Sequence, residues 1–423
     1  MPDPYSLQEI YLDNHATTAV DPRVAESMLA MMQSQYANPG SVTHEAGRRV
    51  AHRIQDCKEQ MLGLLGAPQA ELIFTSGATE SVNLALFGYC LHPKQTRRSL
   101  LIGKLEHRAV LDCAKKLSKS GFIVQSLDTQ RNDPTRLDQP IGSCSLETIE
   151  QHLNKDTALV SLILGNNEIG TLQDMSRIAE LCRSQGVVLH LDATQSVGKL
   201  PFAAYGTSSQ GTSAQGISAQ ACGADLVSFS AHKFYGPKGV GGLLICNPEL
   251  KLSPLIVGGG QQNNLRSGTL NSVGIVGMAR ALEVAVADMP DEVPRIFGLR
   301  DRLWRRLDSA IEGLKLNGPM WPQMLPENSW DLDRLPGNLN VRFPKVDGQS
   351  LMLKIPSLAV SSGSACTSAE PHPSHVLTGI GLSEDQARCS LRFGIGRFNT
   401  ESEIDLASEL IISAYRELLH FVA

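Results

Sequence analysis

Residues 224–234 read ADLVSFSAHKF, an apolar run that ends in a serine, a histidine and a lysine. Four further runs have a similar strand-like character: ELIFTSGATE (71–80), TALVSLILGNNEIG (157–170), VVLHLDATQS (187–196) and GVGGLLIC (239–246). All but the last break into small or polar residues, and helical spacing lies between them, as over residues 173–185. This alternation predicts an α/β fold with a mainly parallel sheet. The polar residues follow the strands, which is where open α/β sheets bind ligands.

The composition excludes several classes of protein. The chain has 423 residues, 42% of them hydrophobic, and a net charge of −5, which gives no electrostatic footprint for nucleic acid or an anionic membrane. No signal peptide is evident, and no run approaches the ~18–20 apolar residues of a membrane-spanning helix. The nine cysteines are odd in number and contain no C-x-x-C pair, which argues against a disulfide framework and a zinc site. We therefore expect a reducing, cytoplasmic compartment.

The length predicts two domains, because single cores rarely exceed ~250–300 residues. The segment VADMPDEVP, around 287–294, is typical of a boundary or hinge, and a helix is expected to follow it over 294–316. We expect a large domain over 17–289 and a smaller α+β domain formed by 1–16 and 290–423.

Two segments are typical of surface loops. Residues 206–220 repeat one polar pentapeptide three times, GTSSQ-GTSAQ-GISAQ, which cannot bury a core, so we expect a solvated insertion in the large domain. Residues 318–338 are rich in proline and tryptophan, and a surface excursion is favoured there over a partner contact.

Two residues suggest an aldehyde cofactor. Lys233 lies at the end of a strand beside polar hydrogen-bonding residues, which suits a Schiff base, although a solvated lysine before a turn fits this stretch equally well. Asp192 ends another strand, where its carboxylate could keep a pyridinium nitrogen protonated, and Gln195 could reach the phenolic oxygen of the same ring. The alternative for Asp192 is a helix N-cap.

Three further residue groups could bind ligand. TSGATES (75–81) would expose backbone N–H groups at a helix N-terminus as a phosphate cradle, although it lacks the spacing of a Walker loop. His107 could stack on an aromatic ring, but a lone histidine is more often structural. Arg392 could bind a substrate carboxylate, with a surface ion pair as the alternative.

Cys366 lies in an unusual setting for a cysteine. The segment SSGSACTSAEP (361–371) surrounds it with small and polar residues instead of the apolar neighbours of a core thiol. Glycine and serine favour a mobile tether, and partial exposure favours a reactive thiolate.

Taken together and in this order, the motifs closely resemble those of the cysteine desulfurases. These are pyridoxal-phosphate enzymes of the class-V aminotransferase family, with the aspartate aminotransferase fold (fold type I). The SSGSACTS loop resembles the loop that marks the branch of the housekeeping iron–sulfur and nitrogen-fixation enzymes. The motifs in chain order are TSGATES, EHRAV, NNEIG, HLDATQSVGK, SFSAHKFYGPKG, RSGT, SSGSACTS and LRFGIGRF.

The resemblance assigns roles to particular residues. Lys233 would form the Schiff base and remove the Cα proton, and His107 would stack on the ring and shuttle protons. Asp192 would pair with the pyridine nitrogen and Gln195 with the phenolic oxygen. Arg392 would hold the substrate carboxylate. The remaining contacts would come from Ala78, Thr79, Ser230 and His232 to the phosphate, from Asn167 to cofactor and substrate, and from Thr269 of a partner subunit to the phosphate. A homodimer with shared sites follows, and no metal is expected, although Cys366 could transiently ligate a cluster on a partner.

The resemblance also implies a reaction. L-Cysteine would become L-alanine while its sulfur forms a persulfide on Cys366. That sulfur would pass to an acceptor protein, such as an iron–sulfur scaffold or a sulfur carrier, for cluster, thio-cofactor or tRNA synthesis. Selenocysteine lyase or cysteine β-lyase activity on the same scaffold is an alternative, and a silent regulatory member of the fold is another. His15, in LDNHATT, departs from the residue common in relatives.

Overall fold

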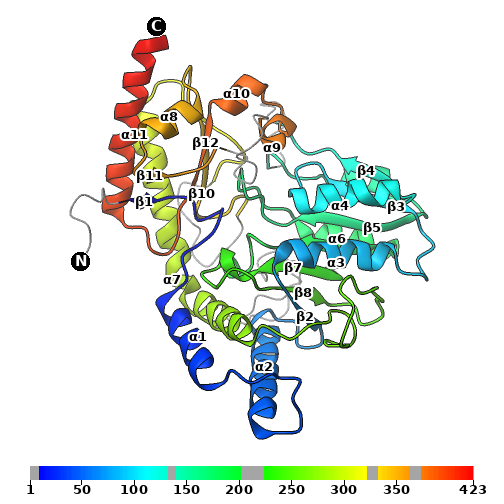
Figure 1. The fold of residues 1–423 in the computed structure, drawn as a ribbon. Helices are drawn as coiled ribbons and strands as arrows, with labels where there is room; N and C mark the ends of the chain where they lie inside the picture. The colour runs from blue at the N-terminus through cyan, green and yellow to red at the C-terminus, as the bar shows by residue number, and fades with distance from the viewer. Residues whose placement is uncertain (1–8, 132–139, 202–222, 322–331, 363–372, 423) are drawn as a thin grey trace.

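A seven-stranded sheet forms the centre of the molecule (Figure 1). The computed structural model describes residues 9–131, 140–201, 223–321, 332–362 and 373–422. The repeat at 206–220, Cys366 and part of the 318–338 segment therefore lie outside the described residues. The strands are β2 (Glu71–Thr75), β3 (Ser99–Gly103), β4 (Ile123–Leu127), β5 (Thr157–Ile163), β6 (Val188–Asp192), β7 (Leu226–Ser230) and β8 (Gly241–Ile245).

The topology confirms the mainly parallel sheet. The spatial order is β2-β8-β7-β6-β5-β3-β4, and only β8 runs antiparallel to its two neighbours. Each of the five apolar runs contains one of these strands, and the stretch at 173–185 contains helix α6 (Met175–Ser184). Strands β5, β6 and β7 lie side by side, so the polar residues that follow them meet at one edge of the sheet.

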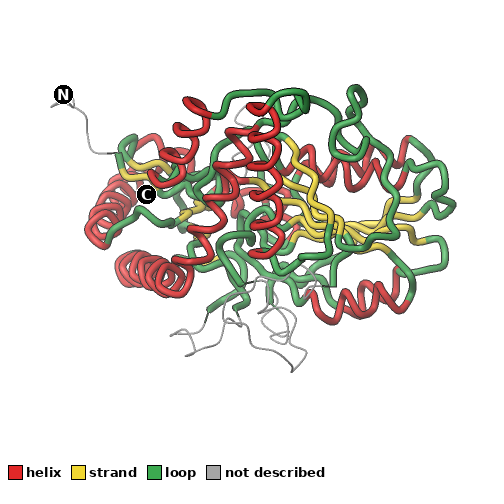
Figure 2. The backbone as a smooth tube through the Cα atoms, turned by 90° about the horizontal axis from the view of Figure 1, so that it is seen from below, coloured by secondary structure: helices red, strands yellow, loops and turns green. Residues whose placement is uncertain are grey.

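Helices cover both faces of this sheet, which Figure 2 shows edge-on between them. Along β2, Leu72 and Phe74 pack into the core with α2 (Glu45–Leu64), whereas Ile73 packs into the core with α3 (Ala78–Cys90) and α4 (Arg108–Lys119). This alternation is the period-two pattern of a strand buried on both faces.

A single helix, α7 (Ser272–Ala310), joins the two parts of the molecule. The boundary or hinge expected around 287–294 lies inside this helix, and the separate helix expected over 294–316 is instead the second half of α7, which ends at Ala310. Met289 and Val293 pack in the core of the large sheet, and Ile296 and Phe297 pack in the second core. Packing on both sides outweighs the helix-breaking tendency of Pro290 and Pro294. The two halves of α7 run in different directions in Figure 1, as prolines within a helix explain.

The second core lies around a small antiparallel sheet with the order β12-β10-β9. Its strands are β9 (Lys315–Leu316), β10 (Asn338–Arg342) and β12 (Ser390–Gly394), and helices α8 (Gly348–Lys354) and α11 (Glu401–Val422) pack on it. The N-terminal strand β1 (Ile10–Tyr11) pairs in parallel with β11 (Leu358–Ala359). The start of the chain therefore lies against its C-terminal third.

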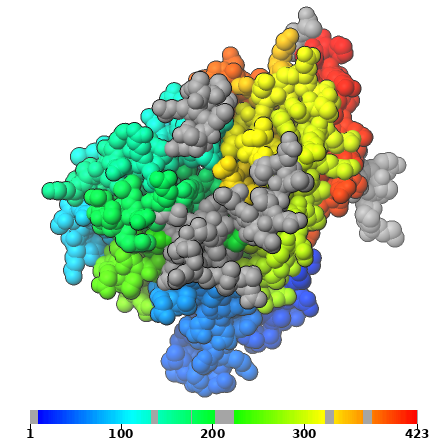
Figure 3. All heavy atoms as spheres, turned by 180° about the vertical axis from the view of Figure 1, so that it is seen from behind, coloured from blue at the N-terminus to red at the C-terminus, as the bar shows by residue number. Residues whose placement is uncertain are grey.

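The remaining helices are short or peripheral: α1 (Pro22–Ser34), α5 (Leu146–His152), α9 (His375–Gly379), α10 (Glu384–Arg388) and the 3₁₀ turn η2 (Ala231–Lys233). In the space-filling view, the blue residues of α1 and α2 protrude at one end of the molecule (Figure 3). Within the described residues, none of the helices has the length and apolar character needed to span a membrane.

Candidate active site

A cavity of about 570 Å³ lies where the carboxyl ends of the parallel strands face the small sheet. Both cores contribute to its lining, from the segments after β5, β6 and β7 and from β12. The predicted site residues that line it are Ala78, Thr79, His107, Asn167, Asp192, Gln195, Ser230, His232, Lys233 and Arg392. Motifs spread over more than 300 residues of sequence therefore meet at one place.

Lys233 ends the 3₁₀ turn that follows β7, so its amine lies at the edge of the sheet. Its Nζ donates to the carbonyl oxygens of His15 (2.9 Å) and Ala16 (2.5 Å). The neighbouring His232 bonds through Nδ1 to the Thr17 hydroxyl (3.1 Å), and burial, followed by the positive charge of Lys233, lowers the pKa of His232 to about 4. His232 is therefore neutral near pH 7 and can accept as well as donate a hydrogen bond.

The phosphate cradle predicted at TSGATES forms the N-terminus of α3. Gly77 caps this helix with φ +149°, a conformation that side-chain-bearing residues rarely adopt. A Cβ at Gly241 on the adjacent strand would lie 2.7 Å from Gly77 Cα, so this close approach also requires glycine. The amides of Ala78 and Thr79 begin the helix, and Ser230 lines the same part of the cavity. Such a helix start attracts an anion through its free N–H groups and its dipole.

Asp192 is the last residue of β6, and Gln195 lies on the turn that follows. Asp192 is buried, and its Oδ1 accepts a hydrogen bond from the Thr194 backbone N–H (3.0 Å). Gln195 is buried as well, and its Nε2 donates to the His15 carbonyl oxygen (2.8 Å). The carboxylate of Asp192 and the amide of Gln195 are thus fixed against one wall of the cavity.

His107 is the N-cap of α4, and its Nδ1 accepts a hydrogen bond from the Ala109 N–H (3.1 Å). This bond leaves the proton of the neutral ring on Nε2. The imidazole therefore has a defined tautomer at the cavity wall.

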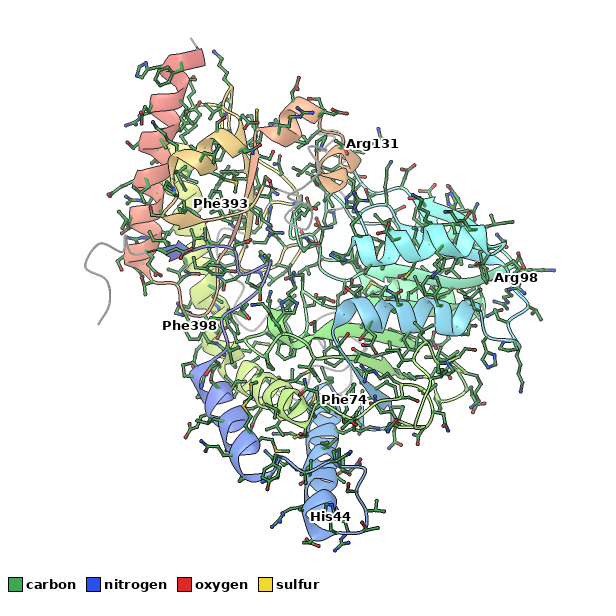
Figure 4. All side chains as sticks on the ribbon, in the orientation of Figure 1. His44, Phe74, Arg98, Arg131, Phe393 and Phe398 are labelled. Carbon is green, nitrogen blue, oxygen red and sulfur yellow. The ribbon has the colours of Figure 1, made fainter. Side chains whose placement is uncertain are left out.

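Arg392 lies on β12 and is 1% exposed. Its neighbour Phe393, labelled in Figure 4, packs in the second core, so Arg392 lies on the opposite face of the strand, toward the cavity. The guanidinium donates to Asp13 Oδ1 (2.8 Å) and to the Asn167 carbonyl oxygen (3.2 Å). Among the described residues its Nε has no hydrogen-bond partner, so one buried donor is left for a ligand.

Sequence reasoning did not assign a role to the two buried glutamates of the cavity wall. Burial raises the pKa of Glu168 to about 7, and the Ser374 hydroxyl donates a short hydrogen bond to its Oε2. Burial also raises the pKa of Glu106 well above its usual range, and its Oε1 accepts from the Ile163 N–H (2.7 Å). Both glutamates lie inside motifs quoted above, EHRAV and NNEIG. Each is the direct neighbour of a residue with a predicted role, His107 or Asn167, and this was the signal that could have identified them.

Among the described residues, one predicted site residue does not line the cavity. Thr269 is exposed and does not line it, while Arg266 of the same RSGT motif pairs with Glu80 at the start of α3 (2.8 Å). Cys366 lies outside the described residues. The described residues on either side of its segment contact the cavity wall, since Ser361 exchanges backbone hydrogen bonds with Arg392 and Ser374 donates to Glu168.

The chemistry of this donor set fits pyridoxal phosphate. The cavity offers a lysine amine, a buried carboxylate on a neighbouring strand and a glycine-opened helix N-terminus, which match the aldehyde, the pyridine nitrogen and the phosphate of that cofactor. Lys233, Asp192 and the start of α3 are the residues that would hold it.

Comparisons with known proteins agree with this geometry. Residues 10–406 match the family model described as aminotransferase class-V. The chain is 43% identical over 405 residues to the cysteine desulfurase IscS of Shewanella woodyi, which covers 95% of this chain and 91% of that protein. Among solved structures, a NifS-like protein has a TM-score of 0.80 at 32% identity, and the match covers 98% of this chain and 100% of that chain. The structure titled SspA in complex with cysteine has a TM-score of 0.73 at 30% identity, and the match covers 92% of this chain and 99% of that chain. This chain therefore belongs to the pyridoxal-phosphate-dependent class-V aminotransferase family, and within it to the cysteine desulfurases.

Proposed function

We propose that the protein converts L-cysteine to L-alanine, holds the sulfur as a persulfide on Cys366 and passes it to an acceptor protein. One observation carries this proposal. The segment with Cys366 leaves the described structure next to Arg392 and returns next to Glu168, and both of these residues line the cavity that contains Lys233. The positions of the flanking residues Ser361 and Ser374 support a role for the Cys366 thiol at this cavity.

Bound pyridoxal phosphate would supply an electron sink that acidifies the Cα–H of an attached amino acid. Lys233 would hold the cofactor and then take the Cα proton on Nζ, for which its position at the end of the strand is suited. The Asp192 carboxylate would keep the pyridine nitrogen protonated, and the Gln195 amide would face the phenolic oxygen. The ring of His107 would lie against the cofactor, with its Nε2 proton available for transfer.

The phosphate would lie at the start of α3. The amides of Ala78 and Thr79, the hydroxyl of Ser230 and the neutral ring of His232 would each offer a hydrogen-bonding group to it. Because the helix dipole and the free N–H groups act together, this site would hold the dianion without a dedicated cation.

The substrate carboxylate would bind Arg392. Asp13 and the Asn167 carbonyl oxygen already hold two of its nitrogens, which fixes the guanidinium and leaves Nε free to donate. Asn167 would contact both substrate and cofactor from the loop after β5. A planar, preoriented guanidinium favours an amino acid over an amine that lacks the carboxylate.

The sulfur step balances without an external oxidant. The Cys366 thiolate would attack the substrate sulfur, so that an S–S bond forms and the substrate C–S bond breaks. The electron pair of that bond goes to the substrate carbon, which takes up a proton and ends as the methyl group of alanine. His107 is placed to move such a proton. Cys366 then holds the sulfur in the oxidation state that an acceptor thiol can take.

We also propose a homodimer in which Thr269 reaches the phosphate of the partner subunit. Thr269 is exposed, and the segment before it carries the exposed apolar side chains Leu255, Ile256 and Val257. Further exposed apolar side chains, Leu29 and Tyr36, lie in and just after α1, and α1 is part of the protruding end of the molecule in Figure 3. Apolar side chains of this kind are typical of an interface.

We also propose two domains, an acceptor protein and a cell compartment. The two cores would correspond to a large domain over 17–289 and a smaller one formed by 1–16 and 290–423. The acceptor would be a protein, such as an iron–sulfur scaffold or a sulfur carrier, and the cell compartment would be the cytoplasm. The structure titled SspA in complex with cysteine supports the choice of substrate.

The test is the formation of alanine from L-cysteine in the presence of a reductant, compared between the parent and Cys366→Ala. Cys389→Ala is the matched control, because Cys389 is partly buried and does not line the cavity. We expect alanine from the parent and the control but not from Cys366→Ala. Equal alanine production by all three would contradict the persulfide route, and pyruvate and ammonia in place of alanine would favour a β-lyase. Activity of Cys366→Ala with selenocysteine alone would favour the lyase alternative.

A further inference from the structure

The side-chain amide of Gln195 is hydrogen-bonded to Lys199 and His15, two residues to which the sequence analysis gave no role. Lys199 Nζ donates to Gln195 Oε1 at 2.9 Å, and His15 Nδ1 lies 3.1 Å from the same oxygen. On the other side of the amide, Gln195 Nε2 donates to the His15 carbonyl oxygen at 2.8 Å. Three hydrogen bonds therefore act on one glutamine that lines the large cavity.

These contacts permit only one orientation of the amide. Rotating it by 180° would place the NH₂ group against the Lys199 amine, which also donates, and the oxygen against the His15 carbonyl, which also accepts. The bonds to the Lys199 amine and to the His15 carbonyl oxygen would then be lost in a site where Gln195 is only 3% exposed. In the observed orientation Oε1 accepts two hydrogen bonds, so the second N–H of Nε2 is the group that remains for a molecule in the cavity.

The protonation of His15 agrees with this arrangement. Because Gln195 Oε1 only accepts, His15 must donate from Nδ1. Burial, followed by the positive charges of Lys199 and Arg392, lowers the pKa of His15 well below its usual range, so the ring is neutral with its proton on Nδ1. His15 thus acts on Gln195 without contributing charge.

Lys199 approaches Gln195 from outside the large cavity. It does not line that cavity, but lines a second cavity of about 30 Å³ together with His15 and Glu292, which is large enough for a water molecule. Burial, and then the charges of Lys233 and Arg392, lower the pKa of Lys199 to about 7, while Glu292 acts in the opposite direction. Any influence of Lys199 on a molecule in the large cavity must pass through Gln195 or through space.

We propose that Lys199 and His15 are positioning residues that fix the amide of Gln195, so that its second Nε2–H donates to the phenolic oxygen of bound pyridoxal phosphate. This inference rests on the proposed function, because it requires the cofactor in the large cavity. The proposal gives one shared role to His15, which differs from the residue common in relatives, and to Lys199, which ends the motif HLDATQSVGK. The task is to keep the hydrogen-bond donor of Gln195 directed at the cofactor.

The experiment measures the visible absorbance of the pyridoxal-phosphate-loaded protein as a function of pH. A phenolic oxygen that loses a donor holds a proton more tightly, so the midpoint of the absorbance change should move to higher pH by roughly one unit. We expect this shift for Lys199→Met and also for His15→Leu. His15→Asn, which keeps an amide donor, should titrate close to the parent.

Gln195→Leu separates positioning from a through-space effect. If Lys199 acts through Gln195, adding Lys199→Met to Gln195→Leu should cause no further shift. A full additional shift in the double variant would overturn the proposal, because it would show that the lysine charge acts directly. His15→Leu gives a second test, because His15 is neutral, and a parent-like midpoint for that variant would also overturn the proposal. A parent that acquires no visible absorbance with pyridoxal phosphate would instead overturn the proposed function.

Discussion

The two walls of the large cavity are built in different ways. On the sheet side, Asp192 and His107 are each fixed by a backbone N–H only two residues further along the chain. On the outer side, Arg392 pairs with Asp13 and Ser374 with Glu168, across 379 and 206 residues of sequence. On the sheet-side wall, formed by Lys233, Asp192 and the start of α3, the side chains of Asp192 and His107 are therefore oriented by local structure, whereas the Lys233 amine is held by the distant carbonyl groups of His15 and Ala16. The outer wall, formed by Arg392 and Ser374, exists only when distant segments have met.

This difference predicts which wall determines the catalytic rate and which wall determines the choice of substrate. The sheet-side wall would carry the cofactor and the proton transfer, and the outer wall would choose the substrate and hold the cysteine segment. Substitutions on the first wall should therefore lower turnover for every substrate. Substitutions on the second should act on KM, on substrate choice or on pH dependence.

The largest expected effect is at Lys233. Lys233→Ala removes both the attachment point of the cofactor and the base, so the rate of alanine formation should fall by more than about 10³-fold. Lys104→Ala, which breaks a surface pair with Asp128, is the control and should leave the rate near that of the parent. A Lys233→Ala protein with more than a tenth of the parent rate would contradict the role of this wall.

Arg392→Lys should lower kcat/KM for L-cysteine by about 100-fold, mainly through KM, because an ammonium cannot replace the oriented guanidinium. Cysteamine, which lacks the carboxylate, provides the comparison in a steady-state assay. The parent should strongly prefer L-cysteine, and the variant should lose that preference. An unchanged ratio between the two substrates would show that another group binds the carboxylate.

Glu168 should make the stability of the protein depend on pH. Burial raises its pKa from about 4.5 in the unfolded chain to about 7 in the folded one, so the folded state binds more protons over this range. The free energy of unfolding should therefore fall as the pH rises from 5 to 7. Glu168→Gln removes this contribution, so its stability relative to the parent should rise by about 2 kcal/mol over the same range in urea unfolding.

Asp128→Asn is the control for this comparison. The Lys104 ammonium holds the pKa of Asp128 below its usual range, so this exposed group stays ionised in the folded protein between pH 5 and 7. The Asp128→Asn variant should therefore parallel the parent. If Glu168→Gln also paralleled the parent, Glu168 would be ionised throughout that range in the folded protein.

The smallest expected effect is at Ser230, which offers one hydroxyl to the phosphate. Ser230→Ala should weaken pyridoxal phosphate binding by about tenfold, measured by fluorescence titration of the cofactor-free protein. Ser228 lies two residues earlier on the same strand and bonds to His190, away from the cavity, so Ser228→Ala is the matched control. Equal losses of affinity in both variants would indicate a general disturbance of β7.

The sequence was most informative where signals are local. Each strand-end motif combines an apolar run with the polar residues that follow it, which is why the sheet, Lys233, Asp192 and the cradle at Thr79 could be predicted. Ten predicted residues line one cavity because parallel strands end at one edge.

The outer wall could not be predicted in the same way. No spacing rule connects Glu168 to Ser374, because their contact exists only after both cores have packed. The continuity of α7 across 287–294 could not be predicted for a similar reason. Local helix-breaking signals indicated a boundary or hinge there, but burial in two cores keeps the helix continuous.

The pairing of β1 with β11 has a consequence for biosynthesis. Residues such as Leu12 and Asp13 bond to Ala359 and Arg392, so this early segment must wait for one that is made 379 residues after Asp13. The seven strands of the large sheet are complete once residue 245 has been made, whereas the outer wall needs β12. Newly made chains therefore have the sheet-side strands before they have a closed site. The segment with His15 and Ala16, whose carbonyl groups hold the Lys233 amine, takes its place only after β12 has been made.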